Sequence, residues 1–375
     1  VIYYNCLEAR FAVELLEAAD IMGIEIRIGI EFYARFRNRY VQLIWVPRGF
    51  SDAQDFLCFL EEEPVAELMA EGKKVCDYQK GHVLSILAAF NNTHGPAIQK
   101  SLGFEAPLLD KSEFLAFVGT GQPSLLHLAE FAQAKMLPPM TAWVKTLRDR
   151  YPEARQEERL RIARLVQTMN QLDSDAILDQ FLRPEKNPQI PDPYTPQQGP
   201  EVPGTLNLSP KEVIFRLAKL HLGYRITLNL SNLSVEDVLE LLYDCEGMIN
   251  RLEIFNLKDY AAGETDQIAD ISQLQQAVNL GNVIQLKRLI RIIIRKLASS
   301  EKGQQKDRIE KLSNILHDIA TLRDFYKGAT LKTRMGSDST GRSPRVHGMG
   351  LVIEDTLPRR SQKAISAADP SRKRI

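Results

Sequence analysis

The sequence is short of the features that mark several common protein classes. Its 375 residues contain four widely scattered cysteines and no C-x-x-C pair, so we expect buried thiols in a reducing cytoplasm rather than a disulfide or zinc framework. No apolar run approaches the roughly 18 residues that a membrane-spanning helix needs. The 48 basic and 48 acidic residues cancel, so total charge favours neither nucleic acid nor membrane nor acidic substrates. These absences predict a cytoplasmic protein with no membrane partner.

The remaining composition is that of an ordinary globular chain. Hydrophobic residues make up 44% and charged residues 26%, and the length allows either one large barrel or two domains. No methionine precedes Val1, and the chain starts directly in an apolar run. We therefore expect the sequence to begin inside a fold, with an upstream piece missing.

The clearest local pattern covers residues 24–46. Residues 24–31 alternate apolar and non-apolar, which is the period of a strand with one buried face. The turn Arg37-Asn38-Arg39 separates them from a second run, 40–46, of β-branched and aromatic residues. An amphipathic helix is predicted just before, over 7–22. Glu31 falls at the predicted far end of its strand, where α/β folds bind ligands.

Helical patterns follow from about residue 51, and Asp52 and Asp110 stand where N-caps are expected. Strands and helices alternate again after residue 209, which predicts an α/β fold with a parallel sheet, closed or open. Between the two halves, prolines crowd residues 184–203. That density excludes a long helix or a central strand, so we expect a surface excursion or linker there.

Five short segments carry a further pattern: Ile2-Tyr3-Tyr4-Asn5-Cys6-Leu7-Glu8, Gly29-Ile30-Glu31-Phe32, Tyr40-Val41-Gln42-Leu43-Ile44, Leu126-His127-Leu128-Ala129 and Met335-Gly336-Ser337-Asp338-Ser339-Thr340. In this order they resemble the successive motifs of the PHP family, the polymerase and histidinol phosphatase superfamily. The resemblance implies a distorted (β/α)7 TIM-type barrel that holds a metal cluster in its mouth and hydrolyses phosphate esters.

The resemblance also implies a division of the chain. We expect the first half of a PHP-like barrel (1–136), a helical and proline-rich insertion (137–208), continued barrel strands (209–259), a helical insertion (260–328), the last barrel strands (329–358) and a basic tail (359–375).

Most metal-ligand positions that the resemblance implies are altered. The residues found there are Tyr3, Tyr4, Gln42, Asn229 and Thr340, and no strand for the family's opening His-x-His pair is present. A two-metal phosphoesterase needs several carboxylates and imidazoles to hold two dications about 3.5–4 Å apart. Amides and a threonine hydroxyl are poor ligands for Zn²⁺ or Mn²⁺, and tyrosine is protonated near pH 7. We therefore predict a depleted metal centre with no bound cofactor.

The family ligands that remain at matching positions are Glu31, His127 and Asp338. Each also has a structural interpretation. Glu31 could end a strand in solvent, His127 has leucines around it and could be a core or rim histidine, and Asp338 could belong to an ordinary turn.

Three residues after Asp338 could place positive charge at the mouth. They are Arg342, Arg345 and His347. The two arginines could hold an anion without a metal, and His347 joins Glu31 and Asp338 as a catalytic candidate if the protein is an enzyme. A solvated basic loop is the alternative.

Residues 283–297 combine an apolar stripe with five cations, which are Lys287, Arg288, Arg291, Arg295 and Lys296. A basic amphipathic helix can bind a membrane or nucleic acid, but an outer helix with a solvated face is the favoured interpretation. It could pair with the helix near 307–326, so the 260–328 region is the expected surface for a homo-oligomer.

Three hypotheses follow for function. The leading one is a PHP-like barrel that binds a small phosphate-containing molecule or acts as a scaffold without hydrolysis. The alternative is a metal-dependent phosphoesterase that uses Zn, Mn or Fe, and the third is a nucleic-acid-associated protein, which the balanced charge disfavours.

Overall fold

The computed structural model describes residues 1–375 except 25, 262, 264, 300–305, 338–357 and 369–375. Six strands form one sheet in the order of the sequence. Its third strand is antiparallel to both neighbours, and every other pairing is parallel. The strands are β1 (Ile2–Tyr4), β2 (Gly29–Phe36), β3 (Arg39–Pro47), β4 (Tyr224–Asn229), β5 (Arg251–Asn256) and β6 (Lys332–Gly336). Five strands therefore point the same way, and their carboxyl ends share one edge.

The sheet curls so that its two edge strands approach each other. The pKa of the Val1 amino group, next to β1, is lowered by burial and then by the positive charge of Arg334 on β6. Strands β1 and β6 are at opposite edges of the sheet, so this charge effect requires the two edges to be close in space. Arg334 stands opposite Glu253 in the register, so the two side chains share a face. Strands β1 and β6 therefore approach each other on the side of the sheet that carries Glu253 and Arg334. We call this side the concave face.

The other face of the sheet packs against helices and forms the main core. Strand residues such as Phe32, Leu43, Leu228 and Leu252 lie in this core together with side chains from the surrounding helices. These are α1 (Ala9–Met22), α2 (Ala53–Glu61), α9 (Pro210–Leu220), α10 (Val235–Asp244), α12 (Ile268–Asn279), α13 (Val283–Ala298), α14 (Lys306–His317) and α15 (Ile319–Phe325). Two more short helices, α11 (Leu257–Ala261) and α16 (Arg359–Ala368), complete the head of the molecule.

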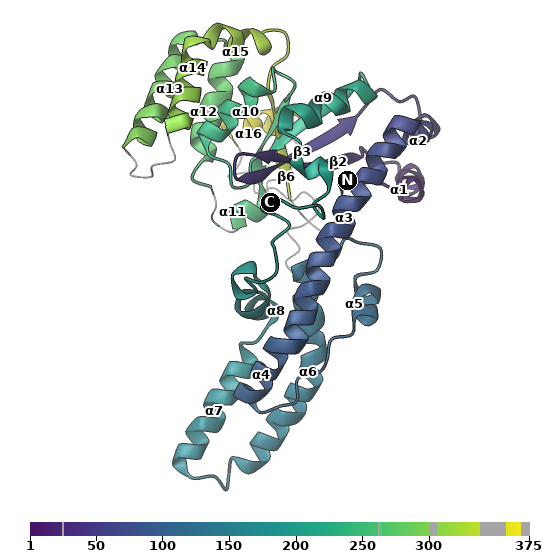
Figure 1. The fold of residues 1–375 in the computed structure, drawn as a ribbon, viewed down its shortest axis with the longest axis vertical. Helices are drawn as coiled ribbons and strands as arrows, with labels where there is room; N and C mark the ends of the chain where they lie inside the picture. Colours follow the sequence, from purple (N-terminus) through teal and green to yellow (C-terminus); the bar gives the residue numbers. More distant parts are fainter. Residues whose placement is uncertain (25, 262, 264, 300–305, 338–357, 369–375) are drawn as a thin grey trace.

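A helical arm projects from the head (Figure 1). Helix α3 (Glu63–Ala89) begins beside the sheet and runs along the arm next to α6 (Leu125–Arg150). The rest of the arm consists of α4 (Gly95–Leu102), α5 (Lys111–Val118), α7 (Gln156–Asn170), α8 (Ser174–Ile177) and two π-helical turns, Phe90–His94 and Leu178–Leu182. The arm has its own hydrophobic core, in which Phe90, Phe114 and Met136 are fully buried.

Many local predictions are confirmed. The turn at Arg37-Asn38-Arg39 joins β2 to β3, and Asp52 and Asp110 are N-caps whose carboxylates accept a bond from the third backbone N–H of α2 and α5. Strand β2, however, begins at Gly29 rather than at residue 24, so Glu31 is its third residue and not its far end. Glu31 still lies level with Tyr4, the last residue of β1, because the register pairs them.

The architecture is mixed α/β with a curled sheet, and a closed seven-stranded barrel is not seen in the described part of the chain. Most of the segment predicted to hold the last barrel strands, 329–358, lies outside the described residues. The predicted boundary at residue 137 falls inside α6, which continues through Pro138 and Pro139. The helices of the predicted 260–328 insertion contribute Leu286, Ile290 and Leu312 to the main core, so they are part of the head.

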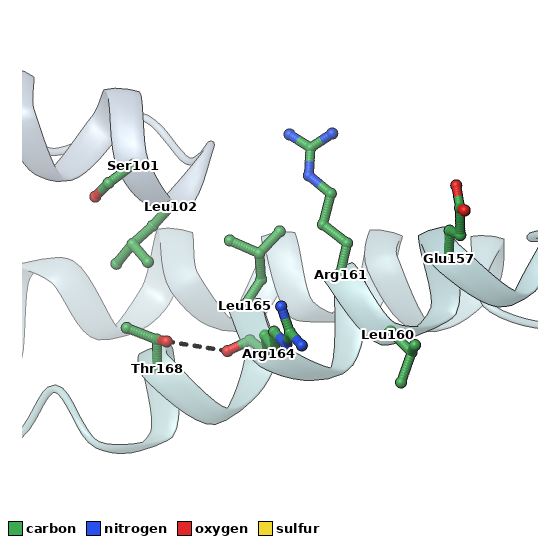
Figure 2. A pocket seen from close by; sticks show the side chains of 8 residues that line it. All are labelled: Ser101, Leu102, Glu157, Leu160, Arg161, Arg164, Leu165 and Thr168. Atoms are coloured by element: carbon green, nitrogen blue, oxygen red, sulfur yellow. Dashed lines mark hydrogen bonds between the residues drawn. The ribbon is translucent and has the colours of Figure 1, made fainter.

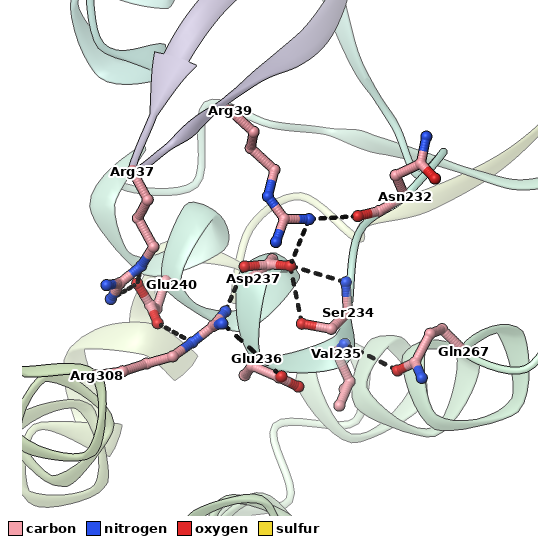
Figure 3. A network of polar contacts seen from close by, with 10 residues as sticks. All are labelled: Arg37, Arg39, Asn232, Ser234, Val235, Glu236, Asp237, Glu240, Gln267 and Arg308. Atoms are coloured by element: carbon pink, nitrogen blue, oxygen red, sulfur yellow. Dashed lines mark hydrogen bonds and ion pairs between the residues drawn. The ribbon is translucent and has the colours of Figure 1, made fainter. Parts of the chain in front are cut away.

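An ion network fixes the β2–β3 hairpin against two helices (Figure 3). Arg37 donates to Glu240 on α10 at 2.6 and 3.0 Å, and Arg39 lies 3.5 Å from Asp237. Arg308 of α14 bonds both carboxylates. Asp237 and Glu240 are 0% and 2% exposed, and burial raises the pKa of Glu240 although Arg37 and Arg308 oppose the rise. The free-energy cost of burying these two carboxylates is offset only while the arginines remain paired with them.

Candidate functional site

The concave face of the sheet is polar at the carboxyl ends of the strands. The register pairs Tyr33 with Gln42 and Asn229 with Glu253, and each pair points to one side of the sheet. Because alternate residues share a side, Glu31 points the same way as Tyr33. Asn229, Glu253 and Glu31 are only 3–4% exposed. Buried polar groups need partners, so this face is either an internal hydrogen-bond network or a ligand site.

Glu253 is held by two neighbours. The Asn256 amide donates to its Oε1 at 3.0 Å, and the Arg334 guanidinium lies 3.2 Å from its Oε2. Gly336 lies directly against the carboxylate, since a Cβ built there would come within 2.4 Å of Oε1. Glu253 is thus part of an ion pair, and a side chain at position 336 would require its carboxylate to shift.

Tyr33 and Gln42 form a neutral pair beside Glu31. The Gln42 amide donates to the Tyr33 hydroxyl at 3.2 Å. Burial and then the charge of Glu31 raise the pKa of Tyr33 well above its ordinary value, so the phenol stays protonated at neutral pH. Tyr194, from the proline-rich segment, packs on Tyr33 with 6.1 Å between ring centroids. The proline-rich segment therefore folds back over the site.

Helix α3 crosses close to the end of β1. Asn5 follows β1 with φ of 58°, a left-handed conformation that asparagine tolerates. Its carbonyl oxygen would lie 1.9 Å from a Cβ built on Gly72, so only glycine permits this crossing. One helical turn further on, the Cys76 thiol donates to the Tyr4 carbonyl at 3.3 Å and lies 3.8 Å from the Cys6 sulfur. The crossing fixes where Asn5 stands at the site.

The structure brings together some of the residues predicted from sequence and separates others. Glu31, Gln42 and Asn229 share the concave face. Tyr4 pairs with Glu31 on that face, whereas Tyr3 pairs with Ile30 on the opposite side and packs on the main core. Tyr3 therefore lies on the other side of the sheet from Glu31, partly buried against the main core.

His127 lies in the first turn of α6, where its Nδ1 is 3.0 Å from the hydroxyl of the N-cap Ser124. The remaining predicted positions lie outside the described residues: Asp338, Thr340, Arg342, Arg345 and His347.

Sequence reasoning missed several residues of the site. Tyr33, Asn256 and Arg334 lie beside the predicted positions but belong to no recognisable motif. Arg334 is a charged residue within the segment predicted to hold the last barrel strands, which is a weak signal, but its partner Glu253 follows only from the strand order.

The described donor set does not fit a two-metal cluster. Among the residues that the structure describes, no group of three or more His, Cys, Asp or Glu side chains could hold a metal ion. The pair of carboxylates on the concave face includes Glu253, which would have to leave Arg334 to bind a cation. The amides of Gln42 and Asn229 are neutral, and Zn²⁺ and Mn²⁺ bind such groups weakly.

Among the helices of the described residues, none combines the length and the apolar character that a membrane span needs.

A separate groove of about 530 Å³ lies on the arm, between the end of α4 and one side of α7 (Figure 2). Its lining residues are Ser101, Leu102, Glu157, Leu160, Arg161, Arg164, Leu165 and Thr168. None of the predicted site residues is among them, so the groove is distinct from the concave face of the sheet.

Comparison with known proteins leaves the family open. No protein-family model matches the sequence. No curated protein matches it either. Among solved structures, the chain is similar to a crystal structure of a protein from Bifidobacterium adolescentis whose name places it among metal-dependent phosphoesterases. The two chains are 13% identical, the match covers 68% of this chain and 66% of the other, and the TM-score is 0.35. A score this low decides neither fold nor activity.

Proposed function

We propose that this protein is a PHP-like barrel with a depleted metal centre, which binds a small phosphate-containing ligand or acts as a scaffold and does not hydrolyse phosphate esters. The observation that carries the proposal is the Glu253 ion pair. In this proposal, a carboxylate that forms an ion pair with Arg334 and accepts a hydrogen bond from Asn256 serves as a structural anion rather than as a vacant metal ligand. The neutral Tyr33–Gln42 pair beside Glu31 supports the same conclusion, because neither group charges at neutral pH.

The charge of the site limits which ligand can bind at the carboxyl ends. The described part carries Glu31, Glu253 and Arg334, whose formal charges leave an excess of one negative charge. A phosphate would be repelled unless further cations face it. In our proposal Arg342 and Arg345, which follow β6 closely in the sequence, supply that charge. Amides such as Asn229 would then orient the ligand through hydrogen bonds.

Hydrolysis assays test the proposal against its alternative, a metal-dependent phosphoesterase that uses Glu31, His127 and Asp338. We expect no turnover of p-nitrophenyl phosphate above background with added Mn²⁺, Zn²⁺ or Fe²⁺, and no difference between the parent and Asp338→Asn. Turnover that Asp338→Asn abolishes, while the surface control Asp270→Asn retains it, would establish the phosphoesterase instead. Asp270 is a suitable control because it forms an exposed ion pair with Lys296 on the helical side of the head.

Calorimetric titration with inorganic phosphate tests the ligand. Arg342→Gln combined with Arg345→Gln should weaken binding by about tenfold, because each arginine contributes charge-assisted hydrogen bonds. The matched control, Arg359→Gln with Arg360→Gln, removes the same charge from two exposed positions on α16 and should leave binding nearly unchanged. Equal losses of affinity in both variants would show unspecific electrostatic attraction.

Self-association through α12–α15 and a cytoplasmic location remain proposals.

A further inference from the structure

The opposite end of the concave face carries a group of arginines that the proposed function does not use. These residues, the arginine cluster, are Arg27, Arg48, Arg225 and Arg251. Arg225 lies two residues before Thr227 on β4, and Thr227 pairs with Arg251 on β5. Arg27 lies two residues before β2 begins at Gly29, and Arg48 directly follows β3. Their backbone hydrogen bonds to Val1 and Gly223 extend the strand pairing at this end of the sheet. Since residues two apart share a side of a strand, all four belong to the concave face at the amino ends of the parallel strands.

The four guanidinium groups are close enough to repel one another. Burial, then Arg251, Arg48 and Arg27, lower the pKa of Arg225. Burial, then Arg48, Arg27 and Arg334, lower the pKa of Arg251. Among the described residues no carboxylate forms an ion pair with Arg48, Arg225 or Arg251, although the chain as a whole is neutral. The like charges of Arg48, Arg225 and Arg251 therefore repel one another, and a bound anion would recover part of that free energy.

Backbone hydrogen bonds hold the cluster in place. The Arg48 N–H donates to the Gly223 carbonyl at 2.7 Å, and the His221 ring lies 2.6 Å from the Arg48 carbonyl. A Cβ on Gly223 would come within 2.5 Å of that carbonyl, so the contact requires glycine. The Val1 amino group donates to the Arg27 carbonyl at 2.8 Å. The backbone therefore fixes the positions from which the arginine side chains extend, so part of an anion site is already organised before a ligand binds.

Two buried side chains separate the arginine cluster from the carboxyl-end site. Ile44 and Thr227, which pair in the register, are 2% and 1% exposed and fill the middle of the concave face. Arg27 is exposed, and the other three arginines are half-buried. The cluster thus opens to solvent at the amino ends, and a ligand there does not depend on any metal or anion at the other end.

We propose that the arginine cluster binds a compact ligand with several linked phosphate groups. Planar guanidinium groups bind phosphate oxygens in pairs, and cations from four different segments can surround an oligophosphate better than a single phosphate. Lys332, opposite Arg251 on β6, adds a fifth cation at the rim. The half-buried position inside a curled sheet suits a small ligand rather than a nucleic-acid duplex, which would contact exposed cations such as those on α13.

Calorimetric titration of the full chain with inorganic tripolyphosphate, at constant ionic strength, tests this proposal. The parent should bind one tripolyphosphate per chain, and Arg225→Gln combined with Arg251→Gln should weaken binding by about tenfold or more. The matched control is Arg288→Gln with Arg291→Gln, which removes the same charge from the exposed face of α13 and should change affinity by less than about twofold.

Folding of the variant is checked by its melting temperature without ligand. Because the four arginines repel one another, Arg225→Gln with Arg251→Gln should melt no lower than the parent. No binding to the parent would overturn the proposal, whether or not the variant folds. Equal weakening in both double variants, or a single-stranded RNA that displaces tripolyphosphate and depends equally on Arg288 and Arg291, would overturn it as well.

Discussion

The crossing of α3 over the end of β1 gives a sharp stability prediction. In Gly72→Ala the new methyl group would lie 1.9 Å from the Asn5 carbonyl oxygen, so the helix or the strand end has to move by more than an ångström. Overpacking of this kind costs about 1–3 kcal/mol, and more where backbone has to shift. Better helix propensity returns at most about 1 kcal/mol. We therefore expect Gly72→Ala to lower the free energy of unfolding by about 2 kcal/mol.

The same helix supplies a matched control. Gly81 also lies inside α3, is exposed, and has no heavy atom within 4 Å of the point that a Cβ would occupy. Gly81→Ala has no contact to disrupt, so it should raise the free energy of unfolding by about 0.5–1 kcal/mol through propensity alone.

Urea unfolding measures both variants. The protein has two tryptophans, so Trp45 in the main core reports on Gly72→Ala, and Trp143 in the arm reports on Gly81→Ala, which lies beside the arm-core residue Val83. Gly72→Ala should shift the midpoint down and Gly81→Ala should shift it up. The reasoning fails if both substitutions move the midpoint in the same direction.

Three further predictions concern the ion network, a tyrosine and the arm. Arg308→Ala should destabilise the fold by about 2–3 kcal/mol in urea unfolding, because buried Asp237 and Glu240 lose the arginine that they share and keep only Arg39 and Arg37. The hydrogen bond to Asp318 raises the pKa of Tyr243 from 10.0 to about 12. The stability that this bond gives the fold is therefore present below pH 10 and is lost as pH rises through about 12. In an ultraviolet titration, Asp318→Asn should return the pKa of Tyr243 toward 10. Phe114→Ala should cost the arm about 3–5 kcal/mol by Trp143 fluorescence and leave the Trp45 transition almost unchanged.

Local structure could be predicted where a pattern of neighbouring residues decides it. The turn at Arg37-Asn38-Arg39 and the caps Asp52 and Asp110 depend on a few adjacent side chains, and all were found as expected. Alternation of apolar residues also predicted a strand before Glu31, but it cannot tell where the partner strands begin. For this reason β2 starts five residues later than the pattern indicated.

Tertiary contacts decided the features that the sequence did not reveal. The predicted boundary at residue 137 does not end α6, which continues through Pro138 and Pro139 with Met136 and Met140 on either side of them buried in the arm core. The division of apolar residues between two cores depends on packing between distant segments and has no local signal. The partner of Arg37 is Glu240, 203 residues away, which no local pattern could identify.

The candidate site was predictable only in outline. The strand register places Glu31, Gln42 and Asn229 on one face, as expected if each lies at a strand position of one sheet. Tyr3 points to the core because the pleat alternates, and a motif comparison ignores that alternation. The Glu253–Arg334 pair depends on β5 and β6 being neighbours, so it became visible only with the topology.

Metal analysis of the purified protein by inductively coupled plasma mass spectrometry tests the central claim most directly. If Glu253 is committed to Arg334 and the neighbouring groups are neutral amides and a protonated phenol, the protein should carry no stoichiometric Zn, Mn or Fe, even after incubation with each metal and desalting. Two or more tightly bound metal ions per chain, lost in Glu31→Gln, would contradict the account.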